Sequence, residues 1–221
     1  PLPVTPPSTI TRFDARERVP NDFTIPAPTD ATTATVRVIE ACDGQLLTGE
    51  SSASLTVING NLEANPTRDL LKIAVVNRYQ DAPPAIAIVR HFNLQNAAIA
   101  SSVAHDSHNV VAVGTSDELL SAAINAVIRE RGGIAVVSGS ETAILPLPIA
   151  GLMSNREAPE VARQFEHLTR LTKAAGCQMR SPLMTLSFLA LLVIPKLKIG
   201  DRGLFDVDQF AFVPLLRNAK D

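Results

Sequence analysis

AAIASSVAHDSHNVVAV, residues 97–113, consists of two apolar runs separated by a polar one. Its two ends predict buried strands at residues 97–100 and 110–113, because runs this apolar suit strands that are covered on both faces. Five consecutive polar side chains lie between these strands, and they are His105, Asp106, Ser107, His108 and Asn109. A buried polar group without a partner costs about 1–3 kcal/mol. We therefore expect these groups to bond to one another or to be used for chemistry.

Further strands are predicted on both sides of this stretch. They are expected at residues 35–40, 52–58, 72–76, 85–89, 134–137 and 142–145. The strand at residues 72–76 is predicted to be apolar on both faces, and the last two strands form a pair across Gly139-Ser140.

Two helices are predicted in the second half of the chain. The first has Thr115 as its cap with Glu118 three residues later, which is the pattern of a capping box, and Gly132-Gly133 follows its end. The second begins between residues 154 and 159 and is closed by Gly176. Residues 183–192 form either a short helix or a strand, because periodicity does not distinguish the two in so apolar a run.

The order of these elements lacks the regular strand–helix alternation of a doubly wound fold. It predicts an α+β fold with a mixed, mainly antiparallel sheet, or sheets, layered with two main helices, and a layered α/β/β/α sandwich is one form that this could take. Residues 1–30 hold seven of the 16 prolines and predict an extended connector, which Phe13, Phe23 and Ile25 could pin to a neighbouring surface. Residues 31–221 are predicted to form the domain, with residues 31–66 as a possible β-hairpin that packs on a neighbouring domain.

Composition excludes several classes of protein. Hydrophobic residues make up 46% of the chain and charged residues 19%, which predicts a sizeable core rather than disorder. The net charge is −2 with scattered Lys and Arg, so we expect no nucleic-acid partner. No apolar run approaches 18 residues, so no membrane partner is expected, and the absence of a signal peptide predicts a cytoplasmic protein. Cys42 and Cys177 lie far apart and are predicted to be free thiols.

The polar stretch is the main candidate for chemistry. His105 and His108 could converge in a loop, where a neutral imidazole can move a proton or bind a metal. Asp106 could orient one of the rings or serve as a third ligand. These three residues are the catalytic candidates. Ser107, Asn109 and His91, which follows a predicted strand, are candidates for holding a substrate. Two histidines lack the third ligand of a catalytic zinc site, so no metal site is predicted here. The alternative is a polar plug with a purely structural role.

Several motifs carry a resemblance to a known family. They are residues 100–109, 113–115, 132–133, 145–154 (LPLPIAGLMS), 184–195 (MTLSFLALLVIP) and 201–207, with 36–39 and 69–74 earlier in the chain. In this order they resemble the C-terminal region of bacterial adenine deaminase, a member of the amidohydrolase superfamily. The resemblance covers roughly residues 30–216, and the ordered series of motifs is more specific than any one of them.

The resemblance implies hydrolysis of adenine to hypoxanthine and ammonia, in adenine catabolism and purine salvage. In that family a binuclear centre of divalent metal lies in an upstream barrel and activates the attacking water. The expected metal is manganese or iron, with zinc as an alternative. The His-x-His signature of that barrel is absent here. The chain is therefore expected to be the C-terminal portion, inactive alone, with metal ligands outside it. Its expected partners are the upstream barrel domain, adenine and further copies of itself.

Two other classes of function remain open at this point. The chain could be a non-catalytic packing or oligomerisation module of a metallohydrolase, because its apolar tail and Pro-rich arm suit covering a partner. It could also be a free-standing sensor of purines or metals. The sequence does not choose between these alternatives and an enzyme portion.

Overall fold

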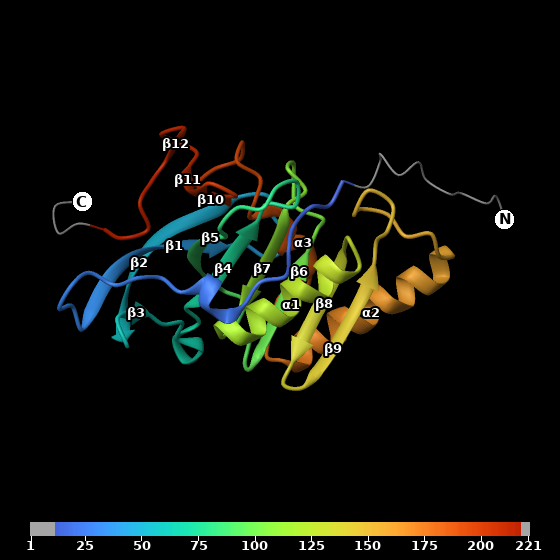
Figure 1. The fold of residues 1–221 in the computed structure, drawn as a ribbon, viewed down its shortest axis with the longest axis horizontal. Coiled ribbons are helices and arrows are strands. Elements are labelled where there is room, and N and C mark those ends of the chain that lie inside the picture. The colour runs from blue at the N-terminus through green and yellow to red at the C-terminus, as the bar shows by residue number, and fades with distance from the viewer. Residues whose placement is uncertain (1–11, 218–221) are drawn as a thin grey trace.

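The computed structural model describes residues 12–217 (Figure 1). The strands are β1 (Thr33–Ala41), β2 (Thr48–Ile58), β3 (Asn61–Leu62), β4 (Leu71–Val76), β5 (Ala85–Arg90), β6 (Ala97–Ser101), β7 (Val110–Gly114), β8 (Gly133–Ser138), β9 (Glu141–Pro146), β10 (Leu197–Gly200), β11 (Gly203–Asp206) and β12 (Ala211–Phe212). The helices are α1 (Asp117–Arg129), α2 (Ala158–Ala174) and α3 (Pro182–Phe188). One nine-stranded sheet has the order β3-β2-β1-β5-β4-β7-β6-β8-β9, and a three-stranded sheet has the order β10-β11-β12.

The face of the large sheet toward α1 carries five alanines as well as Val76, Val110 and Val137. The alanines are Ala74, Ala98, Ala100, Ala112 and Ala135, which pack with the apolar side of α1. At the end of β7, a Cβ added to Gly114 would lie 2.8 Å from the Leu120 side chain and 2.9 Å from that of Ala98. Small residues on this face therefore let α1 approach the sheet closely.

The opposite face carries larger side chains and a second layer. The sheet contributes Ile73, Val75, Ile99, Val111, Val113 and Val136 to this core. Leu168 from α2, Leu186 from α3 and Ile199 from β10 pack against them. The large sheet is therefore the middle layer, with α1 on one face and α2, α3 and the small sheet on the other (Figure 1).

The predicted fold class is confirmed, but the four-layer sandwich is not the form it takes. The strand pairs are antiparallel except for β1 and β5, which run parallel, so the large sheet is mixed and mainly antiparallel. The central strands are apolar on both faces, and a strand of that kind must be covered on both sides. One central sheet meets that requirement, whereas two stacked sheets would leave the outer face of each to be covered separately.

Residues 12–30 lie across the domain, and residues 1–11 of the predicted connector fall outside the described part of the chain. Phe13, Phe23 and Ile25 are buried in the core, which confirms them as pinning residues. A short 3-10 turn at Pro20–Phe23 interrupts the extended path. The β1–β2 hairpin joins the large sheet through the β1–β5 pair. That this hairpin also packs on a neighbouring domain stays a prediction.

Two details of the elements differ from the sequence-based expectation. Ser116, not Thr115, caps α1, because its hydroxyl accepts a hydrogen bond from the Leu119 N–H at 3.3 Å. The Thr115 hydroxyl instead bonds the backbone of Ala97 and so joins β7 to β6. The strand predicted to be apolar on both faces buries a charged residue, because the Lys72 side chain is only 1% exposed and pairs with Asp117.

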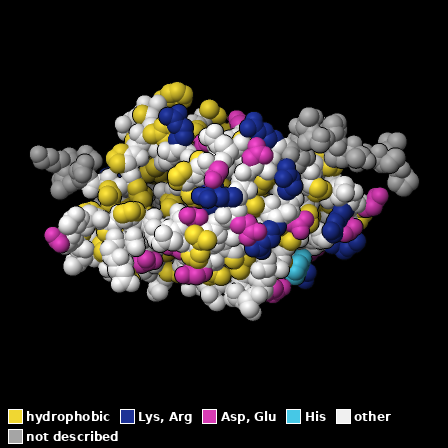
Figure 2. All heavy atoms as spheres, viewed as in Figure 1, with side chains coloured by type: hydrophobic (Ala, Val, Ile, Leu, Met, Phe, Trp, Pro, Cys, Tyr) yellow, Lys and Arg dark blue, Asp and Glu magenta, His cyan; other side chains and the backbone are white. Residues whose placement is uncertain are grey.

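Residues 183–192 begin as a helix, α3, whose first residue is Pro182. On the face that carries α1, Lys and Arg side chains are interspersed with Asp and Glu (Figure 2). No helix within residues 12–217 has the length and apolar character needed to cross a lipid bilayer.

Candidate functional site

The candidate residues lie in loops at one end of the large sheet. Val76 ends β4 opposite Val110, which begins β7, and Ser101 ends β6 opposite Ile134 near the start of β8. Antiparallel pairing therefore brings the loop after β4, the loop between β6 and β7, and the segment before β8 to one edge. The connector after β9 reaches the same edge, because Leu145 pairs with Ile134.

His105 and His108 lie close together in the β6–β7 loop. Their ring centroids are 6.1 Å apart with the planes tilted by 56°, and the His105 ring lies 5.2 Å from that of Phe188 in α3. The backbone fixes both residues, since the His105 N–H donates to the Ser187 carbonyl at 3.1 Å and the His108 N–H to that of Ala104 at 2.6 Å. Both rings are half-buried.

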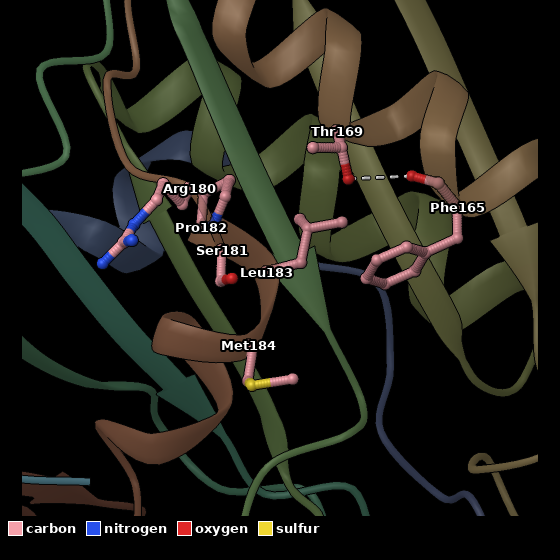
Figure 3. Close-up of a pocket in the computed structure, with 7 residues that line it drawn as sticks. All are labelled: Phe165, Thr169, Arg180, Ser181, Pro182, Leu183 and Met184. Carbon is pink, nitrogen blue, oxygen red and sulfur yellow. Dashed lines mark hydrogen bonds between the residues drawn. The ribbon is translucent and has the colours of Figure 1, made fainter. Parts of the chain in front are cut away.

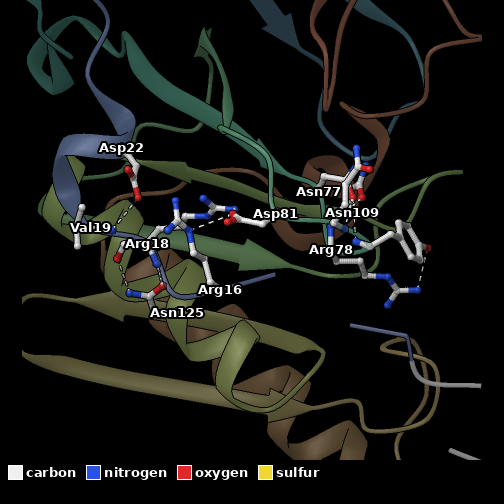
Figure 4. Close-up of polar contacts among 11 residues, drawn as sticks. Arg16, Arg18, Val19, Asp22, Asn77, Arg78, Asp81, Asn109 and Asn125 are labelled. Atoms are coloured by element: carbon white, nitrogen blue, oxygen red, sulfur yellow. Dashed lines mark hydrogen bonds and ion pairs between the residues drawn. The ribbon is translucent and has the colours of Figure 1, made fainter. Parts of the chain in front are cut away.

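Asp106 and Ser107, between the two histidines, are exposed. They border a hollow of about 200 Å³, which Val193 and Asp201 also line. The loop therefore presents a carboxylate and a hydroxyl to solvent and keeps its two imidazoles partly sheltered. Asn109 is buried and turns toward β4 instead, where its Oδ1 accepts a hydrogen bond from the Arg78 N–H at 3.2 Å (Figure 4).

The loop after β4 supplies residues that the sequence did not point out. The Arg78 guanidinium donates to the Tyr79 hydroxyl at 3.0 Å, and that hydroxyl donates to the Ser107 carbonyl at 2.8 Å. The Asn77 side-chain amide donates to the Asp201 carboxylate at 2.6 Å, which joins this loop to the β10–β11 turn. Residues 77–80 (NRYQ) are a polar run that directly follows a buried strand, whereas residues 105–109 are a polar run that directly precedes one. That pattern could have identified them.

The electrostatics of the site favour an uncharged His108. Burial lowers the pKa of its imidazole below the ordinary value of 6.5, the nearby Arg78 and His105 lower it further, and Asp106 acts in the opposite direction. The Nδ1 atoms of His105 and His108 are buried, and neither has a hydrogen-bond partner in the part of the chain that is described. A neutral imidazole at pH 7 can accept a proton. The arrangement therefore suits proton transfer.

A divalent metal does not fit these side chains. No group of three His, Cys, Asp or Glu residues within 12–217 is placed to hold a metal ion. Asp106, the carboxylate that acts on His108, is exposed, and a catalytic metal site uses three protein ligands. We therefore derive no metal-dependent step from the residues of this chain.

His91 does not join the cluster. It follows β5, which runs antiparallel to β4, so it lies beside the start of β4 rather than its end. The length of β4 separates the two edges by about 17 Å. There the His91 ring contacts the Glu40 carboxylate, and its backbone N–H donates to Asp69. His91 therefore lies at the opposite edge from residues 105–109, because the direction of β5 carries it there, and its role in holding a substrate stays a prediction.

Comparison with known proteins places these features in a family. The sequence profile described as "Adenine deaminase C-terminal domain" matches residues 45–211, which include the whole polar edge. The chain belongs to this family. It is 52% identical over 206 residues to a protein of Salinibacter ruber named adenine deaminase, covering 92% of this chain and 37% of that protein. The chain is also similar to two other proteins named adenine deaminase. It is 49% identical over 180 residues to one from Methanosarcina barkeri, covering 81% of this chain and 33% of that protein. It is 42% identical over 180 residues to one from Borreliella burgdorferi, covering 80% of this chain and 33% of that protein.

The chain therefore spans about a third of the length of these curated relatives. Membership of the adenine deaminase C-terminal domain family agrees with the resemblance that the ordered motifs carry. The catalytic and substrate-binding roles given to residues 105–109 stay predictions.

Proposed function

We propose that this chain is the C-terminal portion of an adenine deaminase, which hydrolyses adenine to hypoxanthine and ammonia. The observation that carries the proposal is 52% identity over 206 residues to a protein of that name. Manganese or iron, and alternatively zinc, would be held by an upstream barrel and would supply the activated water. The proposal includes a cytoplasmic role in purine salvage and assembly into a homo-oligomer. This portion alone is expected to be inactive.

Within this function, the β6–β7 loop would face the reacting purine. Its support is a pair of half-buried imidazoles, in one of which, that of His108, burial lowers the pKa below 6.5. A neutral imidazole could take or return a proton during the exchange of the amino group for hydroxyl, while the exposed Asp106 and Ser107 offer polar contacts. Residues of this chain would thus help to shape the site without holding the metal.

The test uses the complete polypeptide with His108→Asn, because asparagine tolerates the left-handed backbone of this residue (φ 52°). Loss of a proton-transfer group should lower kcat/KM for adenine by about a hundredfold, while metal content stays the same. His167→Gln, which removes an imidazole from α2, is the matched control and should leave both unchanged. Wild-type kcat/KM in folded His108→Asn would show that the loop has no part in catalysis.

A second candidate, a packing or oligomerisation module, is supported by the apolar surface of α2, α3 and the connector before α2. Phe165, Met184 and Met153 are 40%, 51% and 56% exposed. Phe165 borders three adjoining hollows, one of which also contains His105 and Phe188 and measures about 300 Å³. In Figure 3 the Phe165 ring points into the space between α2 and Leu183. The surface of a monomer rarely leaves so many large apolar side chains together without use.

These two candidates predict different results for Phe165→Ser in the complete polypeptide. A packing role predicts a smaller mass by light scattering, or faster proteolysis between the parts of the polypeptide, with unchanged kcat/KM per assembled molecule. Unchanged mass and unchanged proteolysis would remove the packing role. Thr169→Ala, one turn further along α2, is the control because it removes little apolar surface.

A further inference from the structure

Arg78 carries a buried positive charge that no carboxylate in the described part of the chain pairs with. It is 5% exposed, and no Asp or Glu within residues 12–217 forms an ion pair with it. Arg18 is buried to a similar extent but pairs with Asp81 at 3.1 Å (Figure 4). Removing a charge from water without a counter-charge is unfavourable, so the position of Arg78 requires an explanation.

The guanidinium of Arg78 connects three segments that are distant in sequence. It donates to the Ala150 carbonyl at 2.8 Å and, through the Tyr79 hydroxyl, reaches the loop that contains His108. The Cζ atom of Arg78 lies 5.8 Å from the centre of the Phe13 ring. The backbone carbonyl of Arg78 accepts a hydrogen bond from the Asp14 N–H. Arg78 is thus the common contact of the N-terminal segment, the β6–β7 loop and the connector after β9.

The chain around Arg78 adopts unusual conformations to make room for it. An added Cβ on Gly151 would lie 2.1 Å from Nη1 of Arg78, so only glycine permits this approach. Ala150, which accepts from the guanidinium, has φ 56°, and His108 has φ 52°. Left-handed backbone is unfavourable for residues with a Cβ, and it persists where the surrounding contacts over-determine it. The contacts of Arg78 supply that constraint.

We propose that Arg78 is a positioning residue whose buried guanidinium fixes the His105–Asn109 loop through the Tyr79 hydroxyl and places a positive charge beside the His108 ring. A cation close to an imidazole disfavours its protonation, and the burial of both groups leaves little water to screen them. The other charged or titratable groups that face His108 are His105, which acts in the same direction, and the exposed Asp106, which opposes it. The importance of this for catalysis rests on the proposed function, but the positioning itself does not.

The test is a titration of the histidine side chains in the 221-residue chain by NMR. In the wild type, His108 should titrate below 6.5. In Arg78→Met its midpoint should rise by about half a pH unit or more, whereas Arg78→Lys, which keeps the charge, should give a smaller rise. Arg18→Met removes a buried arginine from the contact with Asp81 and should leave the His108 midpoint unchanged.

Tyr79→Phe serves as a second variant that leaves the charge in place. It removes the hydroxyl between the guanidinium and the Ser107 carbonyl, so amide hydrogen exchange at His108 and Asn109 should become faster with little change in the His108 midpoint. If Arg78→Met does not fold, the wild-type midpoint and the Arg78→Lys and Tyr79→Phe results decide the question. A wild-type midpoint at or above 6.5, or equal midpoints in wild type and folded Arg78→Met, overturns the proposal.

This experiment separates the two proposals. The titration and the exchange rates do not depend on turnover, so an inactive complete polypeptide would refute the proposed function and leave the role of Arg78 intact. Conversely, an active enzyme with an unshifted His108 would refute the role of Arg78 alone.

Discussion

Asp117→Asn should cause a large loss of stability, because it leaves the buried Lys72 ammonium without a counter-charge. Nζ of Lys72 contacts both Asp117 oxygens, at 2.7 and 2.9 Å, and the Phe23 carbonyl at 3.1 Å. Asparagine keeps the size of the side chain and one acceptor but removes the negative charge. Breaking a buried ion pair in this way costs about 3–5 kcal/mol, a large share of the roughly 5–15 kcal/mol that stabilises an ordinary protein. Urea unfolding followed by circular dichroism at pH 7 measures the change.

Two further variants separate the ion pair from other effects. Glu118→Gln removes an exposed carboxylate from the same first turn of α1, and its loss of about 0.3–1 kcal/mol measures the helix-dipole contribution. The Lys72→Met/Asp117→Asn double variant should lose no more than half of the stability that Asp117→Asn alone loses. Burial raises the pKa of Asp117 even though Lys72 lowers it, so the burial of the charge costs more than the attraction returns. A loss of unfolding free energy below about 1 kcal/mol in Asp117→Asn would refute this reasoning. So would a loss in the double variant that equals the sum of the losses in the two single variants.

Three other predictions test separate features. Gly132→Ala should lose about 2–5 kcal/mol, since the backbone has φ 130° and the new Cβ would lie 2.3 Å from Gly151 Cα; an unchanged melting temperature would contradict this. Burial lowers the pKa of Lys198 from 10.5 to about 8, so the charged side chain destabilises the folded state below pH 8. The free energy of unfolding should therefore rise between pH 8 and 10.5 relative to that of Lys198→Met. Parallel pH profiles of the two proteins would contradict this prediction. Burial raises the pKa of the Cys177 thiol, so the less buried Cys42 should react first with Ellman's reagent, and equal rates for both thiols would count against this.

The strands of the central sheet could be predicted because their apolar runs are long and fully buried. The short strands β3 and β10 to β12 could not, because two to four residues give no measurable period. The order of the strands in the sheet could not be predicted from the sequence either. The strand β6 lies between β7 and β8, and no local sequence pattern indicates which strands pair. The burial of Lys72 as an ion pair could not be predicted either, because its partner, Asp117, is 45 residues away along the chain.

The site could be predicted only where its residues are contiguous. Residues 105–109 were identified because a polar run between two apolar strands is visible locally. Arg78 and Asp201 reach the same edge through the β4–β7 pair and the β10–β11 turn, which are long-range features. The edge on which His91 lies could not be predicted, because the sequence does not show the direction in which β5 runs beside β4.

The position of β1 inside the large sheet has a consequence for anyone who trims this protein. The family profile begins at residue 45, after β1 has ended at Ala41, yet β1 is the strand that joins β2 to β5. A fragment cut to the matched region would separate the β2–β3 ribbon from the rest and would also discard Phe23 and Ile25. The unit that folds is therefore longer than the region that the family profile matches, and expression boundaries are better placed ahead of Phe13.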